Sequence, residues 1–135
     1  MELDKFLVLD KRLSILYIEH NNVRYPFMLD TGCGMSVLDV SSITDKMTIK
    51  DTGKVMPGIT IASGRVDAQI PVVEMDFKIG KQPFSDKFMV LDMSNAFSRL
   101  ESDLKIKPIG LIGTRFFKEN NMKIDFENET ISYAN

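Results

Sequence analysis

One stretch of sequence decides the fold expected of this chain: Phe27-Met28-Leu29-Asp30-Thr31-Gly32-Cys33-Gly34-Met35-Ser36-Val37-Leu38. Its first three residues are apolar without alternation, which is typical of a strand buried on both faces. The strand ends at Asp30, and a carboxylate placed against a core is costly unless it is hydrogen-bonded. Thr31 and the backbone N–H of Gly32 can supply such bonds from a tight turn, because glycine permits a close approach. The stretch therefore predicts a carboxylate held at the end of a buried strand.

A second stretch near the C-terminus predicts another buried strand followed by a helix. Residues 108–113, Pro-Ile-Gly-Leu-Ile-Gly, read as a short strand that ends at glycine. Thr114 is a suitable cap for a helix that contains two phenylalanines and stops near Asn120-Asn121. The segments 122–126 and 130–133 then flank a polar turn, so a terminal hairpin is expected to close the chain.

The remainder of the chain has mainly strand character. Alternating or β-branched apolar residues indicate strands, and glycine and proline separate them. Residues 92–107 are polar without a clear period, and we expect them to form a surface loop. The sequence therefore predicts an all-β barrel or sandwich with one short C-terminal helix and about nine short strands. The other expected strands are 6–9, 13–18, 23–29, 36–38, 47–50, 67–77 and 84–91, with a hairpin between Val55 and Val66.

Length and charge limit the possible functions. The chain has 135 residues, of which 44% are hydrophobic and 27% charged, so one core and a single domain over residues 1–135 are expected. Seventeen basic and nineteen acidic residues give a net charge of −2 without a run of five like charges, so a nucleic-acid partner is not expected. The apolar runs are far shorter than the roughly 20 residues of a membrane span. The first residues carry mixed charge, unlike a signal peptide, so a soluble chain without a membrane partner is expected and its compartment is left open.

The sequence lacks the residues that a metal site or a nucleophilic mechanism would need. The chain has one cysteine, Cys33, and one histidine, His20, so we expect no metal site, no cofactor and no intrachain disulfide. A second Asp-Thr-Gly occurs at residues 51–53, between an alternating segment and a lysine. It is predicted to be a solvated turn, because these residue types are common in exposed turns. It lies too close to Asp30 to belong to a second lobe with its own core.

The two buried stretches together resemble a known family. Residues 27–38 are similar to the active-site motif of aspartic proteases, in which two hydrophobic residues precede Asp-Thr-Gly. Residues 109–117 and 122–126 are similar to the hydrophobic-hydrophobic-Gly strand, the helix and the closing strand of the single-lobe, retroviral-type members. The chain order and spacing also agree, so the resemblance covers residues 13–134. It implies a retropepsin-like acid-protease barrel, with Asp30 as the catalytic aspartate.

The resemblance also implies a mechanism and a partner. Hydrolysis by carboxyl groups needs two that share one proton, one acting as base and the other as acid, and aspartic proteases are themselves the usual illustration of this pair. A chain with one qualifying aspartate supplies the pair only as a homodimer in which Asp30 faces its twin. In the family the threonine bonds across the twofold axis and the glycine backbone supports the carboxylates, which implies those roles for Thr31 and Gly32. The expected activity is that of an aspartic endopeptidase.

The segment from Val55 to Arg65 occupies the place of the family's flap, a hairpin that closes over an extended peptide. The resemblance implies that Ile59 and Ile61 contact substrate side chains and that Gly58 or Gly64 forms the tip. The substrate would be an extended peptide that makes strand-like main-chain bonds.

Two other interpretations stay open from the sequence. One is a catalytically silent member of the same fold that serves as a dimerisation or peptide-binding module. The other is an unrelated small β-barrel that binds an apolar ligand, with Asp30 in an ordinary turn. The chain departs from the family at Cys33, where alanine or serine is usual, and at Gly34, which loosens the turn. Cys33 is expected to act as a small buried hydrophobe.

Overall fold

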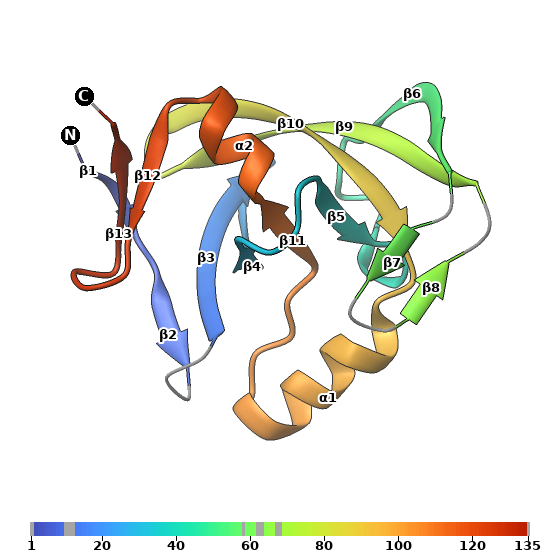
Figure 1. Cartoon of the computed structure of the whole chain (residues 1–135), viewed down its shortest axis with the longest axis horizontal. Coiled ribbons are helices and arrows are strands. Elements are labelled where there is room, and N and C mark those ends of the chain that lie inside the picture. The colour runs from blue at the N-terminus through green and yellow to red at the C-terminus, as the bar shows by residue number, and fades with distance from the viewer. Residues whose placement is uncertain (1, 10–12, 58, 62–63, 67–68, 135) are drawn as a thin grey trace.

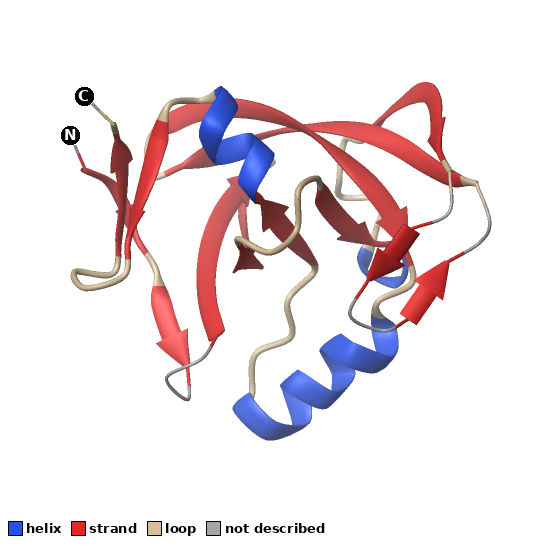
Figure 2. Cartoon of the chain, in the orientation of Figure 1, coloured by secondary structure: helices blue, strands red, loops and turns tan. Residues whose placement is uncertain are grey.

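The computed structural model describes residues 2–9, 13–57, 59–61, 64–66 and 69–134 (Figure 1). Strands dominate the chain, as Figure 2 shows, and the predicted all-β class is confirmed. The strands are β1 (Glu2–Lys5), β2 (Leu7–Leu9), β3 (Leu13–His20), β4 (Val23–Asp30), β5 (Ser36–Asp39), β6 (Lys50–Met56), β7 (Ile59–Ile61), β8 (Gly64–Val66), β9 (Ile70–Ile79), β10 (Gln82–Leu91), β11 (Gly110–Gly113), β12 (Met122–Asp125) and β13 (Thr130–Tyr133). The helices are the 3₁₀ turn η1 (Val40–Ser42), α1 (Ser94–Leu104) and α2 (Thr114–Glu119).

The main sheet closes into a barrel. Its strand order is β2-β3-β4-β11-β5-β10-β9-β6, and a further pairing between β3 and β9 joins the two sides. That pairing is made at Glu19 and Lys78, whose side chains also form an ion pair at 4.0 Å. The strands from β3 round to β9 therefore form a closed circuit of six, and the predicted barrel is confirmed.

The expected terminal hairpin forms a separate three-stranded sheet. β12 pairs with β13 as predicted, and β1 adds to the free side of β13, so the two chain ends lie side by side (Figure 1). No helix in the described part of the chain is long and apolar enough to cross a bilayer.

The barrel strands β5 and β11 lie between two apolar clusters. The larger cluster includes Phe27, Phe88 and Ile112, each 0% exposed, and the smaller includes Val37 and Leu111. Neighbouring residues of β11 thus face different clusters, and every residue of β5 and β11 is buried. Burial on both faces explains the absence of alternation in β5 and β11. In residues 27–29, where the sequence predicted such burial, Met28 is half-buried between two buried residues.

The prediction of a surface loop over residues 92–107 is wrong, because α1 occupies most of this segment. Met93, Phe97 and Leu100 follow helical spacing and pack in the smaller cluster, where Phe97 is 1% exposed. The helix ends at Leu104 and is capped by Lys105, which adopts a left-handed φ of 64°. The polar residues on the outer face of α1 made this narrow apolar stripe hard to detect, so the described part of the chain has two α-helices where one was expected.

The prediction of a turn at residues 51–53 is also wrong, although Asp51 and Gly53 are exposed as expected. These residues belong to β6, which pairs with β9 around a bulge between Asp51 and Lys54. Gly53 provides the positive φ of 72° and its N–H donates to Asp51 Oδ1 at 2.9 Å, while Thr52 Oγ1 donates to the carbonyl of Val72 at 2.6 Å. The same tripeptide thus serves an exposed bulge in the middle of a strand.

A buried aspartate at the end of β5 connects this strand to the start of α1. Asp39 is 0% exposed and accepts hydrogen bonds from the Met93 N–H at 2.9 Å, Ser41 Oγ at 2.8 Å and Ser42 Oγ at 3.0 Å. Asp39→Ala is expected to lower the free energy of unfolding by about 2–4 kcal/mol, because the buried N–H of Met93 loses its charged acceptor and the bonds from Ser41 and Ser42 are lost. Urea denaturation at pH 7 measures this change. The control is Asp92→Ala, which removes an exposed acceptor from Ser94 and should cost less; equal losses would contradict the structural role of burial.

Candidate active site

Asp30 lies at the end of β4, directly beside the end of β11. β11 pairs in parallel with β4, with Gly110 opposite Phe27 and Gly113 opposite Asp30. On its other side β11 pairs antiparallel with β5, with Leu111 opposite Val37. The two stretches that the sequence singled out therefore meet, with β11 inserted between the strands that precede and follow Asp-Thr-Gly.

The turn after β4 holds the Asp30 carboxylate. The N–H of Gly32 donates to Asp30 Oδ1 at 3.0 Å, and the N–H of Cys33 donates to the Asp30 carbonyl at 3.1 Å. A Cβ on Gly32 would lie 3.3 Å from Oδ1, tighter than most such contacts, so glycine suits this position. Thr31 and Gly32 are exposed and Asp30 is half-buried, so the carboxylate is accessible at the surface of one chain.

The start of α2 holds the segment from Asp30 to Met35, which we call the Asp30 loop. The N–H of Thr114 donates to the Cys33 carbonyl at 2.8 Å and the N–H of Arg115 to the Gly34 carbonyl at 3.0 Å. Thr114 Oγ1 also donates to the Thr31 carbonyl at 2.7 Å. The first N–H groups of a helix have no partner within the helix, and here the loop carbonyls satisfy them. The position of the loop therefore depends on the junction between β11 and α2.

Glycines at both ends of β11 allow this close approach. A Cβ on Gly110 would lie 2.3 Å from the Val37 carbonyl oxygen and 2.5 Å from Phe27 Cε2. A Cβ on Gly113 would lie 2.6 Å from the Gly34 carbonyl oxygen. All three distances are shorter than real Cβ contacts, so the hydrophobic-hydrophobic-Gly pattern has a steric cause in this fold.

The two positions that depart from the family motif have different surroundings. Cys33 is half-buried and packs against the smaller cluster, and its Sγ donates to the Met35 carbonyl at 2.9 Å. Burial and the nearby charge of Asp30 raise the pKa of the Cys33 thiol, which keeps it protonated. Gly34 is exposed, and a Cβ there would have no neighbour within 4 Å.

The predicted flap residues lie on a separate two-stranded sheet. β7 pairs antiparallel with β8, with Ile59 opposite Val66 and Ile61 opposite Gly64. The hairpin stands at the side of the barrel near β6 in Figure 1. Gly58 lies outside the described residues. The role of this hairpin over a substrate stays a prediction.

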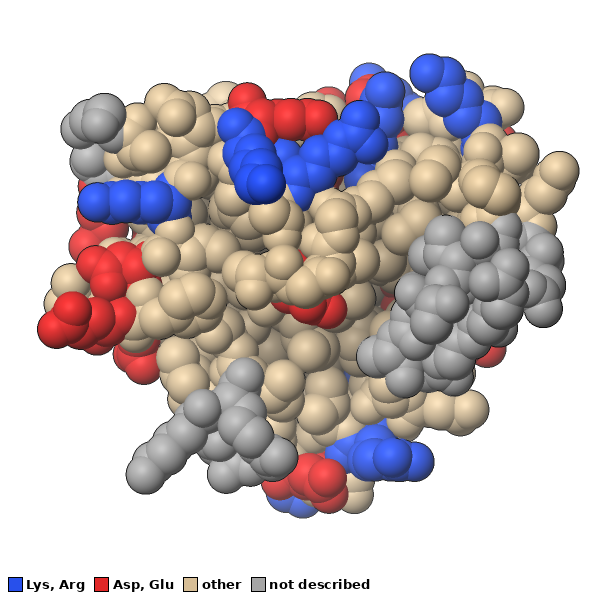
Figure 3. Space-filling view, viewed as in Figure 1, with Lys and Arg blue, Asp and Glu red and all other residues tan. Residues whose placement is uncertain are grey.

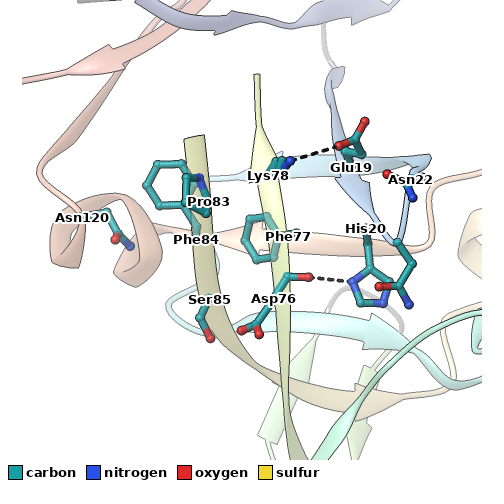
Figure 4. Close-up of a pocket in the computed structure, with 11 residues that line it drawn as sticks. Glu19, His20, Asn22, Asp76, Phe77, Lys78, Pro83, Phe84, Ser85 and Asn120 are labelled. Carbon is teal, nitrogen blue, oxygen red and sulfur yellow. Dashed lines mark hydrogen bonds and ion pairs between the residues drawn. The ribbon is translucent and has the colours of Figure 1, made fainter. Parts of the chain in front are cut away.

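A groove elsewhere on the barrel contains the single histidine. The groove has a volume of about 850 Å³ and lies between the β3–β4 turn, β9 and β10 (Figure 4). His20 is 3% exposed; its Nε2 accepts from the Thr48 N–H at 2.9 Å, so its Nδ1 donates to the Asp76 carbonyl at 2.6 Å. Both ring nitrogens are therefore used by the fold, and His20 connects the hairpin to β9.

Charge is mixed over the surface. In Figure 3, basic side chains gather along the upper edge, over α2 and β10, and acidic side chains lie on the left below the chain ends. A wide uncharged area lies between them, with a small acidic spot near its centre. Among the described residues, no group of three or more His, Cys, Asp or Glu is arranged to hold a metal ion.

A family model described as aspartyl protease matches residues 16–116, from β3 to α2 and across the Asp30 loop. The chain belongs to the aspartyl protease family. No curated protein is similar enough to the chain to count as a match. The aspartyl protease assignment agrees with the resemblance of residues 27–38 and 109–117, and it supports a general aspartic protease function.

The sequence did not reveal the contact between two polar residues, Ser36 within the aspartyl protease motif and Asp86 on β10. Ser36 is 2% exposed, and its Oγ donates to Asp86 Oδ2 at 2.6 Å. A signal for Asp86 was present, because Phe84, Asp86 and Phe88 occupy alternate positions of one strand and so share its inward face. An acid between two aromatic residues on that face indicates a specific partner inside the fold.

Proposed function

We propose that the chain is an aspartic endopeptidase that acts as a homodimer, with Asp30 of each subunit forming the catalytic pair. The observation that carries this proposal is the Asp30 carboxylate at the end of a buried strand, bonded through Oδ1 to the Gly32 N–H, in a member of the aspartyl protease family. The exposure of Thr31 and Gly32 supports the proposal, because these residues would meet their copies across a twofold axis.

The proposed reaction needs both carboxyl groups. Two acids about 3 Å apart cannot both ionise, so one stays protonated and the other acts as base. The ionised carboxylate takes a proton from water, whose oxygen bonds to the peptide carbonyl carbon, while the protonated acid gives its proton to the carbonyl oxygen. The C–N bond then breaks as the leaving nitrogen takes a proton from the protonated member of the pair. The ionised member takes a proton from a hydroxyl of the tetrahedral intermediate, which collapses to the carboxylic acid and restores the single shared proton. Thr31 and Gly32 would hold the carboxylates in position.

We further propose that an extended peptide binds between the Asp30 pair and the β7–β8 hairpin. Main-chain bonds would hold the peptide as an added strand, while Ile59 and Ile61 contact its side chains. The antiparallel pairing of β7 with β8 supports this role, because a two-stranded hairpin attached at one end can close over a substrate.

Subunit mixing tests the shared site. Wild-type chain is equilibrated with a tenfold excess of Asp30→Asn chain, and hydrolysis of an unfolded protein is measured. Activity per wild-type molecule should fall about tenfold, since most wild-type chains then have an inactive partner. With the same excess of Asp51→Asn, total activity should instead rise in proportion to total chain. Activity that follows the amount of wild-type chain regardless of Asp30→Asn would contradict the shared site.

A further inference from the structure

Asp86 is a carboxyl group that faces inward from β10, between Phe84 and Phe88. Its Oδ2 accepts a hydrogen bond from Ser36 Oγ at 2.6 Å, and its Oδ1 accepts from the Lys87 N–H at 2.8 Å. Parallel pairing of β10 with β5 places Phe88 opposite Ser36 and so brings Asp86 to the start of β5. An amide or hydroxyl would also accept from Ser36 at a lower cost of burial, so the choice of a carboxyl requires an explanation.

Ser36 connects this carboxyl to the proposed catalytic centre. Its Oγ donates to Asp86 and accepts from the N–H of Gly113 at 3.0 Å, so both bonds meet at one oxygen. Gly113 lies opposite Asp30 in the β4–β11 pair and directly precedes the two helical N–H groups that hold the Asp30 loop. Two hydrogen bonds therefore lead from Asp86 to the junction that positions the loop.

We propose that Asp86 is a positioning residue for the Asp30 loop, acting through Ser36 on the N–H of Gly113, and that it holds the loop most firmly when ionised. A hydroxyl that donates to a carboxylate becomes a better acceptor, because charge-assisted bonds are strong and neighbouring bonds polarise one another. Protonated Asp86 can instead donate to Ser36 Oγ and compete with the Gly113 N–H. The inference rests on the proposed function for its catalytic consequence, although not for the hydrogen-bond relay.

The surroundings of Asp86 allow it to change charge near neutral pH. Burial raises the pKa of Asp86 from its ordinary value to about 6, against the opposing effect of the bonds from Ser36 and the Lys87 N–H. The negative charge of Glu119 raises this pKa further and Arg115 lowers it, and both face the group from α2. Glu74 of β9 and the Lys87 side chain complete the charged lining of the same cavity of about 240 Å³. Below about pH 6 the acid form dominates, so the loop should be held less firmly there.

The relay can be tested without any enzyme activity. In a pH titration of the wild-type chain followed by amide NMR, the Gly113 signal should shift with a midpoint near pH 6. Asp86→Asn and Ser36→Ala should each abolish this shift. A Gly113 signal that does not titrate in the wild type, or that still titrates in Asp86→Asn, would overturn the proposal.

Glu119→Gln provides a test that leaves Asp86 and Ser36 in place. The midpoint should move to lower pH by a few tenths of a unit, because a negative charge near Asp86 is removed. Thr114, Ser36 and the loop contacts are untouched, so this variant is expected to fold even if Asp86→Asn does not. A midpoint that stays constant or rises would overturn the assignment of the titration to Asp86.

Kinetics then separate positioning from simple loss of structure. For cleavage of an unfolded protein at pH 7, Asp86→Asn should lower kcat about tenfold, which corresponds to about 1.4 kcal/mol of activation free energy. KM should stay within twofold of the wild-type value. The wild-type kcat profile should contain a step near pH 6 that the variant lacks, and Ser36→Thr should retain activity that Ser36→Ala loses. An unchanged profile in Asp86→Asn would overturn the catalytic consequence. If the wild type cleaves nothing while Gly113 still titrates, the proposed function fails and the relay stands.

Discussion

Asp30→Asn is expected to lower kcat/KM for an unfolded protein substrate by on the order of 10³- to 10⁴-fold. Asparagine keeps an oxygen that can accept from the Gly32 N–H, so the turn and the fold should be retained. It cannot take a proton from water, and the shared proton of the pair is lost. Digestion between pH 3 and pH 8, with and without a statine-type inhibitor, measures the effect, and circular dichroism checks the fold.

The second Asp-Thr-Gly supplies a matched control within the same chain. Asp51 is exposed in the β6 bulge, where it accepts from the Gly53 N–H at 2.9 Å much as Asp30 accepts from Gly32. Asp51→Asn removes the same charge and should leave kcat/KM within about twofold of the wild type. Cleavage that survives Asp30→Asn would contradict the mechanism. Peptide binding by both chains without cleavage by the wild type would support the silent peptide-binding module instead.

The strands and the turn that hold Asp30 could be predicted, because the sequence signals for them are local. Leu29 and Ile112 lie in apolar runs without alternation, which indicate strands buried on both faces. The residues that form the turn after the first run and the helix start after the second follow directly in the sequence. The order β4-β11-β5 in the sheet was not predicted and came from the structure. The bulge at Asp51 was missed because turn residues have the same composition whether they end a strand or interrupt one.

The other differences come from contacts between distant segments. Phe97 and Leu100 are two apolar residues in a polar helix, and only the cluster beneath α1 shows why that stripe is sufficient. Ser36 and Asp86 meet because β5 and β10 pair in parallel, which no local pattern specifies. The closure of the barrel at Glu19 depends equally on a partner far along the chain. Sequence patterns thus predicted the residues of the Asp30 loop, whereas its support from β10 needed the three-dimensional structure.

Gly113→Ala should disable the site without changing any polar group. The added Cβ would lie 2.6 Å from the Gly34 carbonyl oxygen, 2.8 Å from the Cys33 carbonyl oxygen and 2.9 Å from the Met35 carbonyl carbon. All three are backbone atoms of the Asp30 loop, so the loop itself has to move. We expect a loss of about 2–3 kcal/mol in the free energy of unfolding, as for overpacked cores, and a fall in kcat/KM of about 100-fold for a displacement of about 1 Å.

Gly34→Ala provides the control for this prediction, because it adds the same methyl group to the same loop. Its Cβ meets nothing within 4 Å and its φ lies outside the left-handed region, so stability should change by less than about 0.5 kcal/mol. Alanine at position 113 keeps the N–H that Ser36 accepts, so the expected loss reflects displacement of the loop and not removal of the relay from Asp86. Equal kcat/KM values for the two variants, measured beside urea denaturation, would show that contact with the β11–α2 junction does not position Asp30.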